Sequence, residues 1–235
     1  MRLSVVMPAH NEEELLESSV AEVTAGLRAR DLAFEVIVVE NGSHDATGAI
    51  AERLAAASPE VRLETLARAD YGRALRTGLL AATGEIVVNF DVDYTDLGFL
   101  DAALTRFGEP PRPTIVVGSK RAPDAHDERS WPRRFVTRVF AAVLRVGFGL
   151  RVSDTHGMKA LDRARVLPLV EASRSDGELF DTELILRAER AGLGVEELPV
   201  TVSERRTSRT SITRRALRTL VGLARLRVTL ARRRR

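Results

Sequence analysis

The sequence predicts an α/β fold built on a doubly wound, mainly parallel sheet. Short apolar runs alternate with helix-like segments through the first half of the 235 residues. The run at 34–39 (FEVIVV) is typical of a strand buried on both faces of a sheet. Polar residues gather directly after the first, second and fourth runs. Because ligands bind beyond the carboxyl ends of the strands in such sheets, these clusters indicate one site at one edge.

The elements of the first half follow from these runs in chain order. Strands are expected at 3–8, 34–39, 61–66, 85–90 and 114–117, and helices at 46–57, 72–82 and 97–107. A further helix is expected after the first strand, with Asn11 as its cap and Glu12, Glu13 and Glu14 in its first turn. Carboxylates suit the helix dipole at that end.

The second half of the chain is less regular. A polar loop is expected at 119–131, helices at 132–146 and 178–191, and an edge strand containing Pro199 at 195–202. The chain has no cysteine, which excludes disulfides, thiolate metal sites and cysteine catalysis. No secretory signal and no stretch of about 18 uncharged apolar residues is visible, so we expect a cytoplasmic protein.

The net charge of +3 is unevenly distributed. Residues 205–235 contain twelve arginines and no acid, which leaves 24 basic against 33 acidic residues, or −9, in residues 1–204. From 213 a helix is expected whose arginines lie opposite an apolar face. That face consists of Leu217, Leu220, Val221, Ala224 and Val228. Such a basic amphipathic helix suits an anionic membrane surface, and a helix packed on the body or on a partner is the alternative.

Asp91 and Asp93 are the central candidates for chemistry. They follow a predicted buried strand and leave the sheet together, so an irregular turn there can direct both carboxylates at one hard cation. Mg²⁺ and Mn²⁺ take oxygen ligands and typically bridge one or two carboxylates to substrate phosphates. A cation in that place would offset charge on a leaving diphosphate.

Eight segments between residues 3 and about 212 carry a family resemblance. They are 5–13 (VVMPAHNEE), 38–47 (VVENGSHDAT), 71–78 (YGRALRTG), 91–93 (DVD), 118–120 (GSK), 154–159 (DTHGMK), 180–184 (FDTEL) and 196–200 (EELPV). In order and spacing they resemble family 2 glycosyltransferases of the GT-A fold, and within these the dolichyl- or polyprenyl-phosphate mannose or glucose synthases. The resemblance implies a GT-A catalytic domain over 1–212, followed by the basic amphipathic helix over 213–235.

The chain departs from the family pattern in four respects. Glu40-Asn41 replaces the usual Asp-Asp or Asp-Asn, and Tyr94-Thr95-Asp96 follows the metal-binding pair. Lys120 replaces an arginine and gives up bidentate phosphate geometry. The synthases often carry or recruit membrane-spanning helices, and none is visible here, which bears on the lipid acceptor more than on glycosyl transfer.

The resemblance also implies roles for individual residues. Asp91 and Asp93 would hold Mg²⁺ or Mn²⁺. Catalytic roles are expected for Asp93, Lys120, Arg133 and Asp181, and Arg205 and Arg209 are candidates for an anionic acceptor. The donor would contact or depend on Pro8, His10, Glu12, Glu40, Asn41, Asp45, Arg73 and Asp91. Asp154 or Asp181 could act as a base toward a hydroxyl acceptor.

These roles describe an inverting glycosyltransferase. A hexose, mannose or glucose, would pass from a GDP- or UDP-sugar to a polyprenyl or dolichyl phosphate, in a protein held peripherally at the inner face of the membrane through its C-terminal helix. A family 2 transferase with a soluble or cell-wall sugar acceptor is the alternative. A nucleotidyltransferase would need a Gly-rich basic loop after the first strand, which 8–12 (PAHNE) lacks. The acidic body argues against a nucleic-acid partner.

Overall fold

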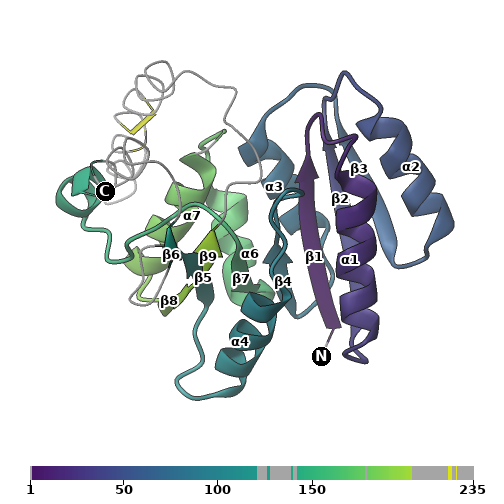
Figure 1. The fold of residues 1–235 in the computed structure, drawn as a ribbon. Helices are drawn as coiled ribbons and strands as arrows, with labels where there is room; N and C mark the ends of the chain where they lie inside the picture. Colours follow the sequence, from purple (N-terminus) through teal and green to yellow (C-terminus); the bar gives the residue numbers. More distant parts are fainter. Residues whose placement is uncertain are drawn as a thin grey trace.

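The computed structural model describes residues 2–120, 126–127, 139, 142–177, 179–202, 222–223 and 226. Its core is a seven-stranded sheet with the order β3-β2-β1-β4-β7-β5-β8 (Figure 1). The strands are β1 Arg2–Ala9, β2 Ala33–Asn41, β3 Val61–Leu66, β4 Ile86–Asn89, β5 Ile115–Ser119, β7 Lys159–Asp162 and β8 Val195–Pro199. A separate two-stranded sheet pairs β6, His126–Asp127, with β9, Thr201–Val202.

One strand of the main sheet runs against the others. β7 pairs antiparallel with β4 and β5, whereas all other neighbours in the sheet pair in parallel. The carboxyl ends of β1, β2, β4, β5 and β8 therefore lie at the same edge as the start of β7. The predicted doubly wound, mainly parallel sheet is confirmed.

Helices cover both faces of the sheet. They are α1 Leu16–Arg28, α2 Thr47–Ala57, α3 Tyr71–Ala81, α4 Leu97–Gly108, α6 Arg163–Ala172 and α7 Leu179–Arg190. Side chains of α1, α2 and α4 share one apolar cluster with Val5 and Met7 of β1, and those of α3, α6 and α7 share the other with Val6. Since successive strand residues point to opposite faces, the continuously apolar strands supply both clusters.

The first half of the sequence prediction is confirmed to within a few residues, with one exception. α1 begins at Leu16, and its cap is Leu15, which makes no side-chain cap hydrogen bond. Asn11 instead has a left-handed backbone (φ 55°), and its Oδ1 accepts a hydrogen bond from the backbone N–H of His44. The prediction of Asn11 as helix cap was wrong because this side chain connects two loops of the sheet edge.

The second half holds three elements that the sequence did not predict: β6, which lies within the predicted loop at 119–131, β7 and α6. β7 contains a buried lysine and a buried aspartate among only four residues, and α6 contains Pro168. Charge in a central strand and proline in a helix both contradict the local patterns. The predicted helix at 178–191 is confirmed as α7, and the predicted edge strand as β8.

The basic tail lies largely outside the described residues. Within it, Leu223 and Leu226 are buried in the same apolar cluster as α3, α6 and α7, and a Cβ added to Gly222 would approach Leu179 Cδ1 to 2.0 Å. These positions pack on the body of the protein, as the alternative for this segment expected. The amphipathic helix over 213–235 stays a prediction. In the described part of the chain, no helix combines the length and the apolarity needed to cross a bilayer.

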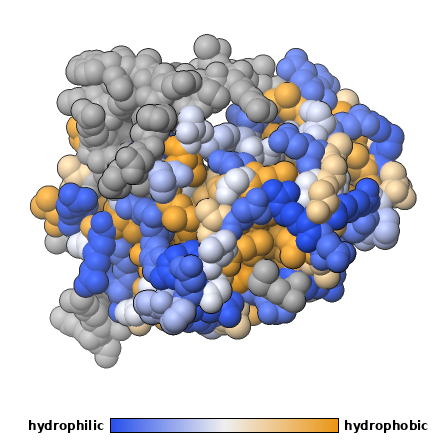
Figure 2. Space-filling model, turned by 60° about the horizontal axis from the view of Figure 1, so that its bottom comes forward, coloured by the Kyte–Doolittle hydropathy of each residue, from blue (hydrophilic) through white to orange (hydrophobic). Residues whose placement is uncertain are grey.

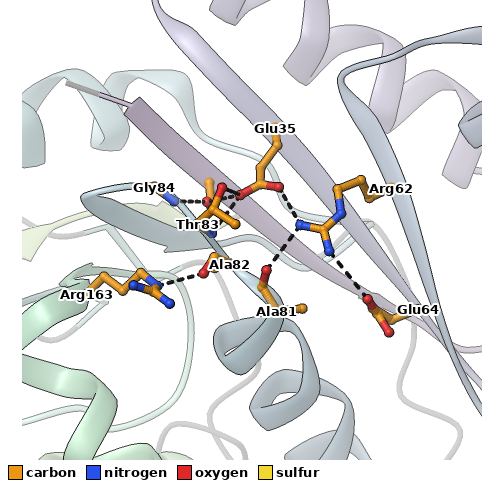
Figure 3. Close-up of polar contacts among 9 residues, drawn as sticks. Glu35, Arg62, Glu64, Ala81, Ala82, Thr83, Gly84 and Arg163 are labelled. Carbon is orange, nitrogen blue, oxygen red and sulfur yellow. Dashed lines mark hydrogen bonds and ion pairs between the residues drawn. The ribbon is translucent and has the colours of Figure 1, made fainter.

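The surface of the molecule mixes residue types. Figure 2 shows one face on which hydrophilic residues surround apolar areas. At the amino end of the strands, Glu35 of β2 is 2% exposed and meets Arg62 of β3 and the 81–84 turn (Figure 3). This cluster joins neighbouring strands at the end of the sheet opposite the polar loops.

Candidate active site

The Asp91–Asp93 turn follows β4 at the carboxyl edge of the sheet. The backbone N–H of Tyr94 donates to Asp91 O over 3.0 Å, and the two residues form a β-bridge. Val92 is 3% exposed and packs in the core, while its carbonyl accepts a hydrogen bond of 2.6 Å from Ser19 Oγ of α1. Because Val92 is anchored, the two aspartates on either side of it stay partly exposed at the edge.

The surroundings of the Asp91 carboxyl disfavour its ionised form. Its pKa is raised to about 6, chiefly by burial and also by the carboxylates of Asp93 and Asp181, while Lys159 and the hydroxyl of Tyr71 act in the opposite direction. Tyr71, the first residue of α3, donates to Asp91 Oδ1 over 3.3 Å. Three carboxylates thus gather around one edge position.

Lys159 supplies a buried cation beside them. It is the first residue of β7 and pairs in register with Asn89 of β4, which places it next to the strand that carries the aspartates. Its Nζ lies 3.0 Å from Asp181 Oδ1 and donates to Gly157 O over 2.7 Å. Lys159 and Asp181 are both almost fully buried, and Asp181 Oδ2 makes no hydrogen bond within the described residues.

Asp181 was predicted for the site, whereas Lys159 and Tyr71 were not. Both missed residues fall inside segments that carry the family resemblance. Nothing in a lysine's sequence neighbours reveals that it will be buried, since its partner comes from a helix 22 positions later along the chain.

Hydrogen bonds join the loops after β1 and β2. His10 Nδ1 lies 2.9 Å from Asn41 O, and the N–H of Asn11 donates to Ser43 Oγ over 3.1 Å. The N–H of Glu12 donates to Thr47 Oγ1 over 2.7 Å. The two loops therefore form one unit beside the aspartates, in the region expected to receive a nucleoside.

Two predicted donor residues use their side chains within this unit. Glu40, 7% exposed, accepts the N–H of Ser43 over 2.6 Å, and Asn41 Oδ1 accepts the N–H of Asp70 over 2.8 Å. Asn41 thereby ties the second loop to the start of α3.

The other predicted donor residues lie around the same loops. Asp45 accepts from the N–H of Thr47 over 3.0 Å; although burial opposes this, its hydrogen bonds lower the pKa of its carboxyl. Pro8 is buried near the end of β1, and Arg73 is exposed in the first turn of α3. Their part in donor binding stays a prediction.

Of the four basic residues predicted for catalysis or for the acceptor, only Lys120 lies among the described residues. Lys120 directly follows β5, and its Nζ lies 3.5 Å from Asp154 Oδ2. Arg133, Arg205 and Arg209 lie outside the described residues.

The carboxylates of Asp91 and Asp93 suit a divalent cation whose remaining ligands would come from the substrate. No group of three or more His, Cys, Asp or Glu side chains in the described residues is arranged to hold a metal alone. Asp91 and Asp93 could together provide oxygen ligands, and a cation beside Asp91 would offset the burial and the neighbouring carboxylates that raise its pKa. Magnesium-type sites commonly combine one or two carboxylates with phosphate oxygens from the substrate.

A GT-A glycosyltransferase is the class of protein that this sheet and site define, with paired aspartates after β4 beside the joined loops of β1 and β2. The family model described as Glycosyl transferase family 2 matches residues 4–167, and the chain belongs to this family.

Several curated proteins are similar to it. Glycosyltransferase AglD of Haloferax volcanii is 35% identical over 208 residues, covering 85% of this chain and 33% of that protein. An uncharacterized glycosyltransferase of Mycobacterium tuberculosis is 35% identical over 204 residues, covering 86% of each chain. A dolichyl-phosphate beta-glucosyltransferase of Drosophila melanogaster is 30% identical over 220 residues, covering 87% of this chain and 68% of that protein. The chain thus spans about a third of AglD but most of the mycobacterial protein.

Solved structures share the fold. Glucosyl-3-phosphoglycerate synthase from Mycobacterium tuberculosis with UDP has a TM-score of 0.72 at 22% identity, covering 97% of this chain and 79% of that one. The same enzyme with Mn²⁺, UDP and glucosyl-3-phosphoglycerate has a TM-score of 0.69 at 24% identity, covering 99% and 79%. These likenesses establish the architecture.

Proposed function

We propose that this protein is an inverting hexosyltransferase that moves glucose or mannose from a UDP- or GDP-sugar to a polyprenyl phosphate. The observation that carries the proposal is the position of Asp91 and Asp93, at the sheet edge where the β1 and β2 loops meet. The dolichyl-phosphate glucosyltransferase relative, at 30% identity, supports the lipid acceptor.

Different residues along the sheet edge would bind the nucleoside and the metal ion. The loops containing His10, Glu12 and Glu40 would bind the nucleoside on one side of the aspartates. Asp91 and Asp93 would hold Mg²⁺ or Mn²⁺, which when bound supplies positive charge to the donor diphosphate. Mn²⁺ with UDP in the glucosyl-3-phosphoglycerate synthase structures supports this assignment.

The acceptor would approach from the other side, over β7 and β5. Its phosphate oxygen attacks the anomeric carbon as the bond to the diphosphate breaks, with inversion at that carbon. A phosphate acceptor is already ionised near neutral pH, so this attack needs no strong base. Lys120, with Arg133, Arg205 and Arg209, would bind the acceptor anion.

A family 2 transferase with a soluble acceptor is the second candidate. Glucosyl-3-phosphoglycerate synthase has been solved with phosphoglyceric acid, which supports a small phosphorylated acceptor on this architecture. With a hydroxyl acceptor, the buried Asp181 or Asp154 would be available as a base.

The test combines donor binding with transfer. Purified protein with Mn²⁺ is screened against UDP- and GDP-sugars for thermal stabilisation, then assayed for transfer to a short polyprenyl phosphate and to phosphoglyceric acid. We expect stabilisation by one donor and a labelled lipid product, both lost in Asp93→Ala. Donor stabilisation without lipid product would remove the lipid acceptor from the proposal, and no donor stabilisation would overturn the whole of it.

A further inference from the structure

Glu197 of β8 holds a coil segment that belongs to another part of the chain. Its carboxylate accepts the backbone N–H of Ser153 over 3.0 Å and that of Asp154 over 3.1 Å. The Ser153 hydroxyl donates to the same carboxylate over 2.7 Å. Three donors on one carboxylate make a strong charge-assisted anchor.

A second carboxylate continues the anchor along the same segment. Glu189, near the end of α7, accepts the N–H of Arg151 over 3.0 Å and that of Val152 over 3.2 Å. Four consecutive backbone donors, from Arg151 to Asp154, are therefore satisfied by two side chains from α7 and β8. The segment forms no helix or strand, so these carboxylates take the place of a backbone ladder.

The anchored segment positions Asp154. The side chain of Asp154 is 4% exposed, its Oδ1 accepts the N–H of His156 over 3.0 Å, and its Oδ2 lies 3.5 Å from Lys120 Nζ. Asp154 Oδ2 makes no hydrogen bond in the described part of the chain, so Lys120 is its nearby counter-charge. Ser153 Oγ also lies 3.1 Å from Ser119 Oγ at the end of β5. Movement of the segment would therefore move the partner of Lys120.

This assembly is separate from the nucleoside loops. Between β4, which carries the aspartates, and β8 lie β7 and β5. Neighbouring strands are about 4.8 Å apart, so β8 is roughly 14 Å from β4 along the sheet. The loops of β1 and β2 lie on the opposite side of β4. A change at Glu197 should therefore reach the acceptor side without disturbing the donor side.

We propose that Glu197 is a positioning residue for acceptor recognition, acting through the Ser153–Asp154 backbone on Asp154 and Lys120. This inference rests on the proposed function, since it requires an anionic acceptor bound near Lys120. Glu197 does not itself touch the reacting atoms. Its contribution is to keep a buried carboxylate and its lysine in one arrangement before the acceptor binds.

The variant Glu197→Gln tests the proposal in the full chain. An amide places a donor against the N–H and hydroxyl donors that the carboxylate accepts. We expect KM for the polyprenyl phosphate to rise about tenfold, with donor KM and Mn²⁺ dependence changed less than about twofold. The matched control is Glu196→Gln on the same strand, whose carboxylate pairs with Arg106 Nε at 2.7 Å and should leave both KM values unchanged.

Amide hydrogen exchange supplies a readout that does not depend on the acceptor. In Glu197→Gln the amides of Ser153 and Asp154 should exchange faster, while those of β7 stay protected. Unchanged exchange would overturn the anchor. Faster exchange with unchanged acceptor KM, or an equal rise of donor and acceptor KM, would overturn the positioning role.

The failure of the proposed function gives a different result. In that case the wild-type protein transfers sugar to no phosphorylated acceptor, and the acceptor role of Glu197 is rejected with it. The exchange experiment still decides whether the two carboxylates anchor the segment.

Discussion

Glu35 lies near the amino end of β2 and Asp91 just beyond the carboxyl end of β4, at opposite ends of the parallel strands of one sheet, and their pKa values are shifted in opposite directions. Glu35 Oε1 accepts three hydrogen bonds, from Ser4 Oγ, Thr83 N and Thr83 Oγ1, each 2.7 Å, and Oε2 accepts from Arg62 over 2.7 Å (Figure 3). Although burial opposes ionisation, these donors lower the pKa of Glu35 to about 2.

The Asp91 carboxyl is desolvated beside the carboxylates of Asp93 and Asp181 and accepts a hydrogen bond from the Tyr71 hydroxyl, and its pKa rises to about 6. The difference indicates that the amino end of the sheet serves stability and the carboxyl end serves binding. The amino end satisfies its carboxylate completely and stabilises the fold. The carboxyl end leaves negative charge unbalanced, which costs stability until a cation or a substrate supplies the missing charge.

The largest expected effect comes from neutralising the carboxyl end. Asp91→Asn should lower the sugar-transfer rate about a hundredfold or more, because one of the two proposed cation ligands is lost. The free energy of unfolding without metal or donor should stay the same or rise, because the cost of burying an ionised carboxylate and its repulsion from Asp93 and Asp181 are removed. Transfer assays and urea denaturation at pH 7.5 measure the two quantities, and a clear loss of stability would contradict the comparison.

The same chemical change at the amino end should have the reverse outcome. Both oxygens of Glu35 accept hydrogen bonds, so in Glu35→Gln the new NH₂ group faces a hydrogen-bond donor whichever way the amide is turned. We expect a loss of about 2–3 kcal/mol in the free energy of unfolding, while the transfer rate per folded molecule stays within about twofold. Denaturation and activity are measured on the same preparation. Reduced activity at full folding would show that this cluster communicates with the site.

The pH dependence of stability should separate the two groups. The Glu35 contribution is fully present above its unfolded pKa of 4.5 and is lost as pH falls through its folded pKa of about 2. The Asp91 contribution has the opposite sign: it is fully present below the unfolded pKa of 3.8 and is lost as pH rises through about 6.

Urea denaturation of the metal-free protein between pH 3.5 and 7.5 checks this pair of windows. The difference between wild type and Asp91→Asn should change mainly between pH 4 and 6. The difference between wild type and Glu35→Gln should shrink only below pH 4.5. If both differences changed in the same window, the assigned environments would be wrong.

The smallest effect is expected at the outer edge of the Glu35 cluster. Glu64 lies 3.7 Å from Arg62, and both side chains are partly exposed. Glu64→Gln should change the free energy of unfolding by less than about 0.5 kcal/mol, because solvent screens the pair. A loss comparable to that of Glu35→Gln would mean that Arg62 depends on both carboxylates.

Much of the first half could be predicted from its sequence. The strand at 61–66 was placed at its observed bounds, and the aspartates after β4 were placed at the correct edge. Local patterns suffice there because β1, β2 and β4 are largely apolar on both faces, β3 alternates apolar and polar residues, and a polar turn follows each of β1, β2 and β4. β7 could not be predicted, since Lys159 in a strand is favourable only beside Asp181 of α7.

The sequence by itself determined the order of strands and helices in the first half and the position of Asp91 and Asp93 beyond a buried strand. These follow from residue patterns over a few neighbours. The resemblance to a glycosyltransferase family was carried by the order of eight motifs along the chain. Only the tertiary structure decided how each charged side chain is partnered. Glu35 pairs with Arg62, Lys159 pairs with Asp181, and Glu197 accepts hydrogen bonds from the backbone of Ser153 and Asp154. Each of these partners comes from a different element, so the charge balance depends on strand order and helix packing, which local patterns do not specify.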